Sequence, residues 1–298
     1  MNAEAVIGID LGGSAIKAGR FSHQGHCLQA LTLPTPQPTS PEAVLAVMVD
    51  AIAQLDPDRT ALAIGVGTPG PSDPQGRVAR IAINLEGWRN IPLADWLEEK
   101  TGIPTVLEND ANCAGIGELW LGAGQAFQSF ILLTLGTGVG GAIILNGQLF
   151  VGQDGTAGEL GLITCNPEGP PCNSGNNGSL EQYVSIRAIR RQMGAEPEEL
   201  GKRATQGDLE AIAFWQHYGK TLGAGLASLL YVLTPQAVLI GGGICESAPY
   251  FLPALQAEID RRVLPTSRLG LQILKASLGN QAGMVGAARL AWQKRVKP

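Results

Sequence analysis

Two stretches of similar sequence decide the fold: residues 9–14 read Ile-Asp-Leu-Gly-Gly-Ser, and residues 134–141 read Thr-Leu-Gly-Thr-Gly-Val-Gly-Gly. Each stretch ends an apolar run typical of a strand, at residues 6–11 and 130–135. Each is followed by a second strand-like run, a glycine-containing reversal and a third run. Two strand–glycine turn–hairpin units in one chain predict an internal duplication, with two lobes that face a cleft.

The glycines of these turns favour an anionic ligand. Backbone N–H groups approach an anion closely where no Cβ intervenes. One such turn is more often a plain hairpin, but the repeat and a third glycine run, Gly241–Gly243, favour a phosphate bound between the lobes. Gly136, Gly138 and Gly141 match G-x-G-x-x-G but open a strand rather than a helix, which disfavours a Rossmann site. A Walker-type sequence is absent from these turns, which disfavours a P-loop.

Composition narrows the class of protein. A chain of 298 residues with 45% hydrophobic and 16% charged residues can bury a large core, most simply as two domains. A net charge of −5 argues against nucleic acid as a partner. The five scattered cysteines predict reduced thiols in the cytoplasm. Neither a secretory signal nor an apolar run of about 18 to 20 residues is present, so no membrane association is expected.

The order of elements indicates an α/β protein. Strand-like runs such as 61–66 and 105–107 alternate with segments of helical periodicity. Helices are predicted at 42–54, 93–100, 111–121, 180–193, 196–205 and 208–233, with a last helix opened by residues 280–283. The irregular stretch 152–178 holds seven glycines and three prolines, and long loops of this kind are usually functional or tied down.

Eight motifs, in order, carry a family resemblance. They are Asp10–Ser14 (DLGGS), Asn84–Trp88 (NLEGW), Glu108–Asn112 (ENDAN), Leu135–Gly141 (LGTGVGG), Gly158–Gly161 (GELG), Asn166–Cys172 (NPEGPPC), Leu180–Tyr183 (LEQY) and Gly241–Gly243. Together they resemble the ROK family (repressors, open reading frames and kinases) of the actin-like sugar-kinase superfamily. The resemblance covers residues 5–290.

The resemblance implies an α/β, two-lobed actin-like ATPase (ribonuclease H-like) fold with an interlobe cleft. Residues 1–117 would form the N-terminal lobe, joined by a C-terminal helix at 283–298, and residues 118–282 the larger C-terminal lobe. It further implies ATP and Mg²⁺ in the cleft, phosphoryl transfer to a hexose, and a homodimer or homotetramer. Because the first strand begins near Ala5, the helix-turn-helix domain of the repressor branch is not expected.

The catalytic and phosphate-binding residues follow from the motifs. Asp110 starts a helix, where a carboxylate commonly serves as an N-cap, and the resemblance assigns it the role of general base. Asp10 would hold Mg²⁺ through water or, alternatively, cap its own glycine turn. Lys17 is more typical of a solvated strand residue than of a phosphate ligand. The phosphate-facing donors would be Gly12, Gly13, Ser14, Gly136, Thr137 and Gly138, with Gly241, Gly242 and Gly243 on the adenine side.

Planar amides and carboxylates suit a sugar because each can bind neighbouring hydroxyls in pairs. Taken singly, Asn84 and Glu181 are typical of a loop or a helix start. As a set, the residues at the family's sugar-contacting positions are Asn84, Asn109, Asp110, Glu159 and Glu181.

The chain departs from the family at its structural zinc. The family's one histidine and three cysteine ligands correspond here to Leu162, Cys172, Ser174 and Ser179, so zinc is not expected. Cys165 lies nearby but not at a ligand position. Leu162 replaces a sugar-contacting histidine and leaves the identity of the sugar open. Prolines and Asx- or ST-type turns would order the loop at 166–178 in place of the metal.

The sequence therefore predicts a cytoplasmic, ATP-dependent hexose kinase that phosphorylates the 6-hydroxyl of glucose. A kinase for fructose, mannose or an N-acetylated amino sugar is the alternative within enzymes, and polyphosphate remains open as a donor. A non-catalytic sugar-binding regulator is a rival that Asp110 and both phosphate turns disfavour. An actin-like ATPase is a third, disfavoured by the sugar-contacting set.

Overall fold

The chain divides into two compact units. The computed structural model describes residues 4–82 and 85–296. Unit 1 comprises Met1–Ala126, Gly147–Ala157 and Leu278–Pro298, and unit 2 comprises Phe127–Asn146 and Gly158–Ser277. The lobe boundaries expected from the sequence, at 117/118 and 282/283, stay predictions.

Unit 1 is built on a five-stranded sheet in the order β3-β2-β1-β4-β7. Its strands are β1 (Ala5–Leu11), β2 (Ala15–Ser22), β3 (Cys27–Pro34), β4 (Ala61–Thr68) and β7 (Thr105–Asn109). The first three form an antiparallel meander, whereas β4 and β7 run parallel to β1. Strands β5 (Ala79–Ile81) and β6 (Arg89–Ile91) form a separate ribbon. The parallel strands bring the carboxyl ends of β1, β4 and β7 to one edge of the sheet.

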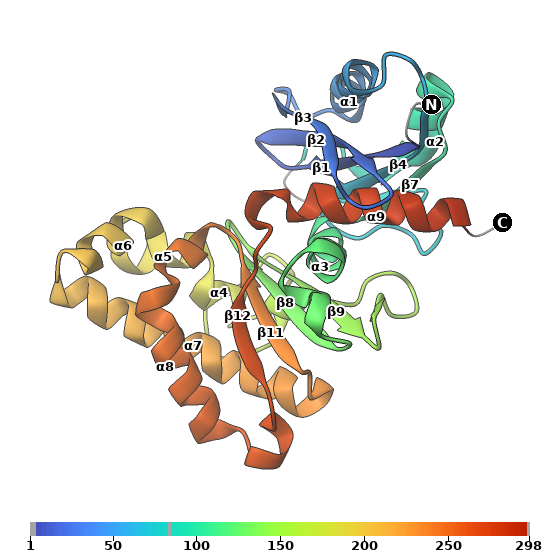
Figure 1. The fold of residues 1–298 in the computed structure, drawn as a ribbon. Helices are drawn as coiled ribbons and strands as arrows, with labels where there is room; N and C mark the ends of the chain where they lie inside the picture. The colour runs from blue at the N-terminus through green and yellow to red at the C-terminus, as the bar shows by residue number, and fades with distance from the viewer. Residues whose placement is uncertain (1–3, 83–84, 297–298) are drawn as a thin grey trace. The chain divides into compact units, whose positions relative to one another are not determined.

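Side chains of β1 alternate between the two faces of this sheet. Ile7 and Ile9 pack with helices α1 (Pro41–Leu55) and α2 (Leu93–Thr101). Val6 packs on the opposite face with α9 (Ala282–Val296). Figure 1 shows α1 over one face of the sheet and α9 along the other, with α3 (Asp110–Leu121) beside α9.

Helix α9 approaches the sheet backbone to backbone. A Cβ on Gly8 would lie 2.2 Å from the Met284 carbonyl oxygen, and one on Gly65 would lie 1.8 Å from that of Ala287. On the α3 side, a Cβ on Gly286 would lie 1.6 Å from the carbonyl oxygen of Cys113. Glycine is therefore required at these positions for α9 to occupy its place in the core.

Unit 2 repeats the same topology. Its sheet has the order β10-β9-β8-β11-β12, from β8 (Phe130–Leu135), β9 (Val139–Leu145), β10 (Gln148–Leu149), β11 (Ala237–Gly241) and β12 (Gln272–Lys275). Strand β9 is antiparallel to β8, whereas β11 is parallel to it and β12 to β11. Since both sheets carry their strands in the same relative order, the predicted internal duplication is confirmed in the topology.

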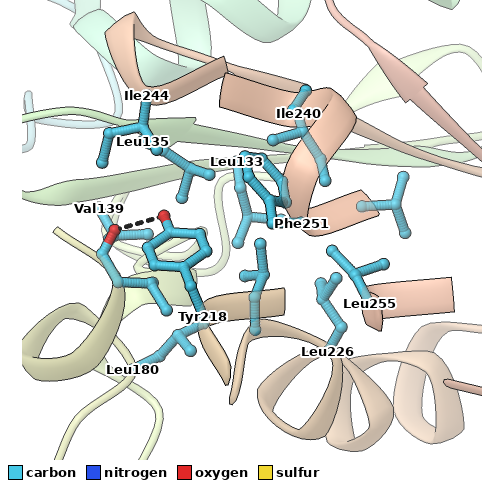
Figure 2. Close-up of a cluster of buried hydrophobic side chains, with 14 of the residues drawn as sticks. Leu133, Leu135, Val139, Leu180, Tyr218, Leu226, Ile240, Ile244, Phe251 and Leu255 are labelled. Carbon is cyan, nitrogen blue, oxygen red and sulfur yellow. Dashed lines mark hydrogen bonds between the residues drawn. The ribbon is translucent and has the colours of Figure 1, made fainter. Parts of the chain in front are cut away.

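The core of unit 2 lies between this sheet and the helices α7 (Leu209–Leu233) and α8 (Ala248–Arg262), which pack against each other. Figure 2 shows Leu133, Leu226, Ile240 and Phe251 in this core. The buried hydroxyl of Tyr218 donates a 2.7 Å hydrogen bond to the Val184 carbonyl, drawn as a dashed line. This bond fastens the segment around residue 184 to the core.

The helix predicted over 180–193 is wrong as one element. The structure has a single turn, α4 (Glu181–Val184), and then α5 (Ile186–Met193). Ser185 is extended and caps α5 by accepting the Ala188 N–H at 3.1 Å. The remaining described helices are α6 (Pro197–Thr205) and the 3₁₀ turns Ala123–Ala126, Leu160–Leu162, Gly243–Ser247, Pro265–Arg268 and Gly279–Gln281. Among the described helices, none is both long and apolar enough to span a bilayer.

Candidate active site

In unit 1 the predicted catalytic residues gather at the carboxyl edge of the parallel strands. Asp10 is paired in register with Gly67 of β4, and Gly67 with Glu108 of β7. A Cβ on Gly67 would lie 3.4 Å from the Cα of Asp110. Burial raises the pKa of the Cys113 thiol, and the charges of Glu108, Asp10 and Asp110 raise it further, so all three carboxylates lie near this sulfur.

The first glycine turn is held by its own backbone and by Thr35. The Gly12 N–H donates to the Ala15 carbonyl at 2.9 Å, and the Thr35 hydroxyl donates to the Gly12 carbonyl at 2.7 Å. The Gly12 N–H is thus used within the turn. The donors that the turn can offer to an anion are those of Gly13 and Ser14, which are exposed.

The Asp10 carboxylate is held by β2 and by the start of α9. Lys17 Nζ lies 3.7 Å from Asp10 Oδ2 and donates a 3.0 Å hydrogen bond to the Asn280 carbonyl. The carboxylate also lies against Gly283, where a Cβ would come within 2.8 Å of Asp10 Cγ. Burial raises the pKa of Asp10, and the charge of Lys17 partly offsets this.

These surroundings fit a magnesium ion bound with a nucleotide. Mg²⁺ in phosphoryl-transfer sites usually takes one or two carboxylates and completes its shell with phosphate oxygens and water. Asp10 is such a carboxylate, beside a turn whose exposed amides suit phosphate. No group of three or more His, Cys, Asp or Glu side chains arranged to hold a metal occurs in residues 4–82 and 85–296.

Asn109, rather than Asp110, caps helix α3. Its side-chain oxygen accepts the N–H groups of Ala111 at 2.9 Å and Asn112 at 3.0 Å. Asp110 is the first helical residue, and its Oδ1 also accepts the Ala111 N–H, at 2.7 Å. The interpretation of Asp110 as the N-cap is wrong. Because Asn109 Oδ1 is used in capping, Nδ2 is the group of this side chain that can bind a ligand.

Glu108 is a residue of this edge that the sequence analysis did not assign. Its Oε1 accepts the Asn109 N–H at 2.8 Å and Asn112 Nδ2 at 3.0 Å, which fixes the turn from β7 into α3. Burial raises the pKa of Glu108. The residue stands inside the Glu108–Asn112 motif, which was the available signal. The predicted sugar ligand Asn84 lies outside the described residues.

In unit 2 the second glycine turn is tied to the predicted sugar ligands. The Gly136 N–H closes the turn on the Gly138 carbonyl at 2.9 Å, so Thr137 and Gly138 hold the donors left for an anion. Glu181 Oε2 accepts the N–H of Val139, the first residue of β9, at 2.9 Å. Desolvation of the Glu159 carboxylate, followed by the nearby charge of Glu181, raises the pKa of Glu159.

The third glycine run lies beside this turn. Gly241 ends β11, and Gly242 has φ of +88°. A Cβ on Gly242 would lie 2.2 Å from the carbonyl oxygen of Leu135, the last residue of β8. Gly243 begins a 3₁₀ turn. The run predicted for the adenine side thus contacts the strand that enters the second turn.

The loop at the family's zinc positions is ordered by hydrogen bonds of its own. Asn176 Nδ2 donates to the Leu162 carbonyl at 3.2 Å and to Thr164 Oγ1 at 2.9 Å. The Gly178 carbonyl accepts the N–H groups of Cys165 and Asn166. Desolvation of the Cys172 thiol is outweighed by hydrogen bonds, those of Ser174 first, which lower its pKa. The predicted satisfaction of the loop backbone by asparagine side chains is confirmed at Asn176, whereas the effect of the prolines on the unfolded chain stays a prediction.

Comparison with known proteins extends over nearly the whole chain. A family model described as the ROK family matches residues 6–294. A glucokinase of Thermotoga maritima is 32% identical over 96% of both chains. The crystal structure of a ROK family glucokinase from Streptomyces griseus with glucose and AMPPNP has 34% identity and a TM-score of 0.85, covering 97% of this chain and 99% of that one. A ROK hexokinase from Thermus thermophilus gives the same identity and TM-score, covering 99% and 100%.

Proposed function

The chain belongs to the ROK family, and from that premise we propose that it is an ATP-dependent glucose kinase. The predicted α/β, actin-like fold class is confirmed by the structural match to ROK sugar kinases. Glucokinases at 32% and 34% identity, matched over nearly their whole length and one of them crystallised with glucose and an ATP analogue, support this activity. The observation in this chain that carries the proposal is Asp110, a carboxylate at the same sheet edge as Asp10 and on a helix that another residue caps.

Asp110 acts as the general base. A carboxylate oxygen of Asp110 accepts the proton of the glucose 6-hydroxyl as that oxygen bonds to the γ-phosphorus of ATP. The bond between the γ-phosphorus and the β–γ bridging oxygen breaks, and ADP leaves. Because Asn109 satisfies the first N–H groups of α3, the Asp110 carboxylate is not needed as the cap.

The two glycine turns hold the phosphates. We assign this role to the N–H groups of Gly13, Ser14, Thr137 and Gly138, with Gly241–Gly243 on the adenine side. Mg²⁺ bound with the nucleotide supplies positive charge to the phosphate oxygens, and Asp10 is the residue that would hold it through water. Asn84, Asn109, Asp110, Glu159 and Glu181 would receive the hexose hydroxyls. The carboxylates of Asp110, Glu159 and Glu181 accept hydrogen bonds, which suits a ligand with many hydroxyl groups.

A coupled ADP-release assay over a panel of hexoses tests the proposal. We expect turnover with glucose and Mg-ATP, with glucose 6-phosphate as the product. Faster turnover of fructose, mannose or an N-acetylated amino sugar would reassign the substrate within the family. Glucose binding by calorimetry without turnover of any hexose would replace the kinase by a sugar-binding regulator. Repeating the assay with polyphosphate tests the second donor.

We also propose a cytoplasmic protein that forms a homodimer or homotetramer and does not bind nucleic acid. The net charge of −5 supports the last point, because a surface that binds phosphate backbones is usually basic. Sedimentation velocity measures the oligomer. A gel-shift assay with duplex DNA is expected to show no retardation.

A further inference from the structure

Glu181, a predicted hexose ligand, also contacts the second glycine turn. One carboxylate oxygen, Oε2, accepts the Val139 N–H directly after the second glycine turn. The same carboxylate lies close enough to Glu159 to raise the pKa of that residue. The side chain assigned to the hexose therefore also holds the backbone assigned to the nucleotide phosphates.

The fit between Glu181 and the turn leaves no room for a side chain. A Cβ on Gly138 would lie 2.5 Å from Glu181 Oε2 and 3.3 Å from its Cδ, whereas Oε1 would be 4.0 Å away. Oε2 thus faces the turn and Oε1 is directed away from it. A Cβ on Gly136, in the same turn, would meet only the Gly138 carbonyl oxygen, at 4.0 Å. The turn is sensitive to added volume at one glycine and tolerant at the other.

The segment that carries Glu181 is fixed at its other end. The Ile186 N–H donates to the Gly136 carbonyl at 2.8 Å, so residues 181–186 hold both ends of the turn. Tyr218 in turn holds the Val184 carbonyl from the core. The turn and the segment that carries Glu181 therefore hold each other in place, and both are fixed to the core of unit 2.

We propose that Glu181 couples the hexose site to the nucleotide-phosphate turn, so that occupation of either site preorganises the other. This inference rests on the proposed function. A hexose hydroxyl on Oε1 would fix the carboxylate, and the carboxylate would then hold Val139 and Gly138 in the geometry that receives phosphate. Coupling is reciprocal, so AMPPNP must raise hexose affinity by the same factor as hexose raises AMPPNP affinity.

Alanine variants of the two glycines test the coupling without nucleotide. We expect Gly138→Ala to displace the Glu181 carboxylate and to weaken glucose binding in calorimetry by about tenfold, within the usual range of coupling between sites. Gly136→Ala, the matched control, is expected to keep glucose affinity within about twofold, because its methyl group meets open space. Circular dichroism establishes that both variants are folded.

A double-mutant cycle ties the effect to Glu181. In a Glu181→Ala background, Gly138→Ala is expected to cause no further loss of glucose affinity. Additive losses would overturn the proposal, as would equal glucose affinity in Gly138→Ala and Gly136→Ala. If either Gly138→Ala variant fails to fold, wild type and Glu181→Gln decide the matter. Glucose should tighten AMPPNP binding to wild type at least about fivefold and to Glu181→Gln much less, and absence of coupling in wild type would refute it.

Failure of the proposed function gives a different result. If the wild-type protein binds no hexose of the panel, both the proposed kinase activity and the proposed coupling are excluded. A wild type that binds glucose and turns it over, but shows no effect of Gly138→Ala on glucose affinity, would remove the coupling alone.

Discussion

At the scale of single residues, Asp110 and Asn109 divide two tasks that one carboxylate often performs. We expect Asp110→Asn to lower kcat by about 10²- to 10⁴-fold while glucose still binds, because asparagine keeps the shape but cannot accept a proton. Asn109→Ala is the control for capping, with an expected loss of about 1 kcal/mol in unfolding free energy. Steady-state kinetics and urea unfolding measure the two effects. An Asp110→Asn enzyme with a tenth or more of wild-type kcat would exclude the general base.

Gly283 gives a second test at this scale. Gly283→Ala would place a methyl group within about 3 Å of the Asp10 carboxylate. We expect kcat to fall and the Mg²⁺ concentration needed for half-maximal rate to rise, with the melting temperature nearly unchanged. Gly286→Ala lies in the same helix but meets the Cys113 backbone, so its expected effect is lost stability without a changed Mg²⁺ requirement. The same Mg²⁺ requirement in Gly283→Ala and wild type would refute the positioning of Asp10 by α9.

Glu108 predicts a signed pH dependence of stability. Because burial raises its pKa, the folded chain keeps this proton at a pH where the unfolded chain has released it. Its contribution to the free energy of unfolding therefore falls as pH rises through that interval. Glu108→Gln keeps an acceptor for Asn109 and Asn112 and does not titrate, so it should gain stability over wild type at pH 7.5 but not at pH 4.

Glu98 provides the matched control, because its contribution to the free energy of unfolding should change with pH in the opposite direction. Hydrogen bonds from Arg77 lower the pKa of Glu98, so Glu98→Gln should lose stability relative to wild type, and more at pH 7.5 than at pH 4. Urea unfolding at the two pH values measures both variants. A Glu108→Gln variant whose difference from wild type is the same at both pH values would show that Glu108 does not titrate differently on folding.

At the scale of elements, the loop between residues 162 and 180 is expected to be independent of zinc. Serine hydroxyls are poor zinc ligands, and Cys172 is the one thiolate at the family's ligand positions. We expect chelators to leave melting temperature and glucose affinity unchanged, and elemental analysis of untagged protein to find no stoichiometric zinc. One zinc per chain, removable only with loss of glucose binding, would contradict this and indicate a rearranged site with Cys165 and Cys172.

Asn176 should carry much of the loop's order instead. Its side chain donates to Leu162 and Thr164 and accepts the Asn177 N–H, so Asn176→Ala is expected to cost about 3 kcal/mol at roughly 1 kcal/mol per hydrogen bond. Asn173→Ala, at an exposed position of the same loop, is the control and should change stability little. Chemical unfolding followed by circular dichroism compares the two variants.

Local sequence predicted the elements well where periodicity was strong. The helix expected at 42–54 is α1 (Pro41–Leu55), and that expected at 208–233 is α7 (Leu209–Leu233). The segment 180–193 failed because Ser185 adopts an extended conformation to cap α5, and apolar spacing does not report a one-residue break. The sequence also could not predict that Gly283 lies against Asp10, because that contact joins the first strand to the last helix.

At the scale of the whole chain, two separate cores predict two unfolding events. Trp215 is in the core of unit 2, while Trp88, Trp96, Trp120 and Trp292 belong to unit 1. We expect ¹⁹F resonances of fluorotryptophan to disappear at two urea concentrations, with Trp215 separate from the other four. Trp215→Phe assigns its resonance. If all five native resonances disappear at the same urea concentration, and the calorimetric and van't Hoff enthalpies are equal, the chain unfolds as a single cooperative unit.

Helix α9 packs against β1 and β4 but is separated from them in the sequence by the whole of unit 2. The sheet of unit 1 leaves the ribosome early, but the helix that covers its second face is translated after all of unit 2. A nascent chain therefore carries an uncovered apolar face, around Val6 and Ala63, until residues 282–296 have been translated. Unit 2 can fold during synthesis, whereas unit 1 has to wait for its final helix. A ribosome stalled before residue 282 should hold a chain whose N-terminal sheet recruits chaperones.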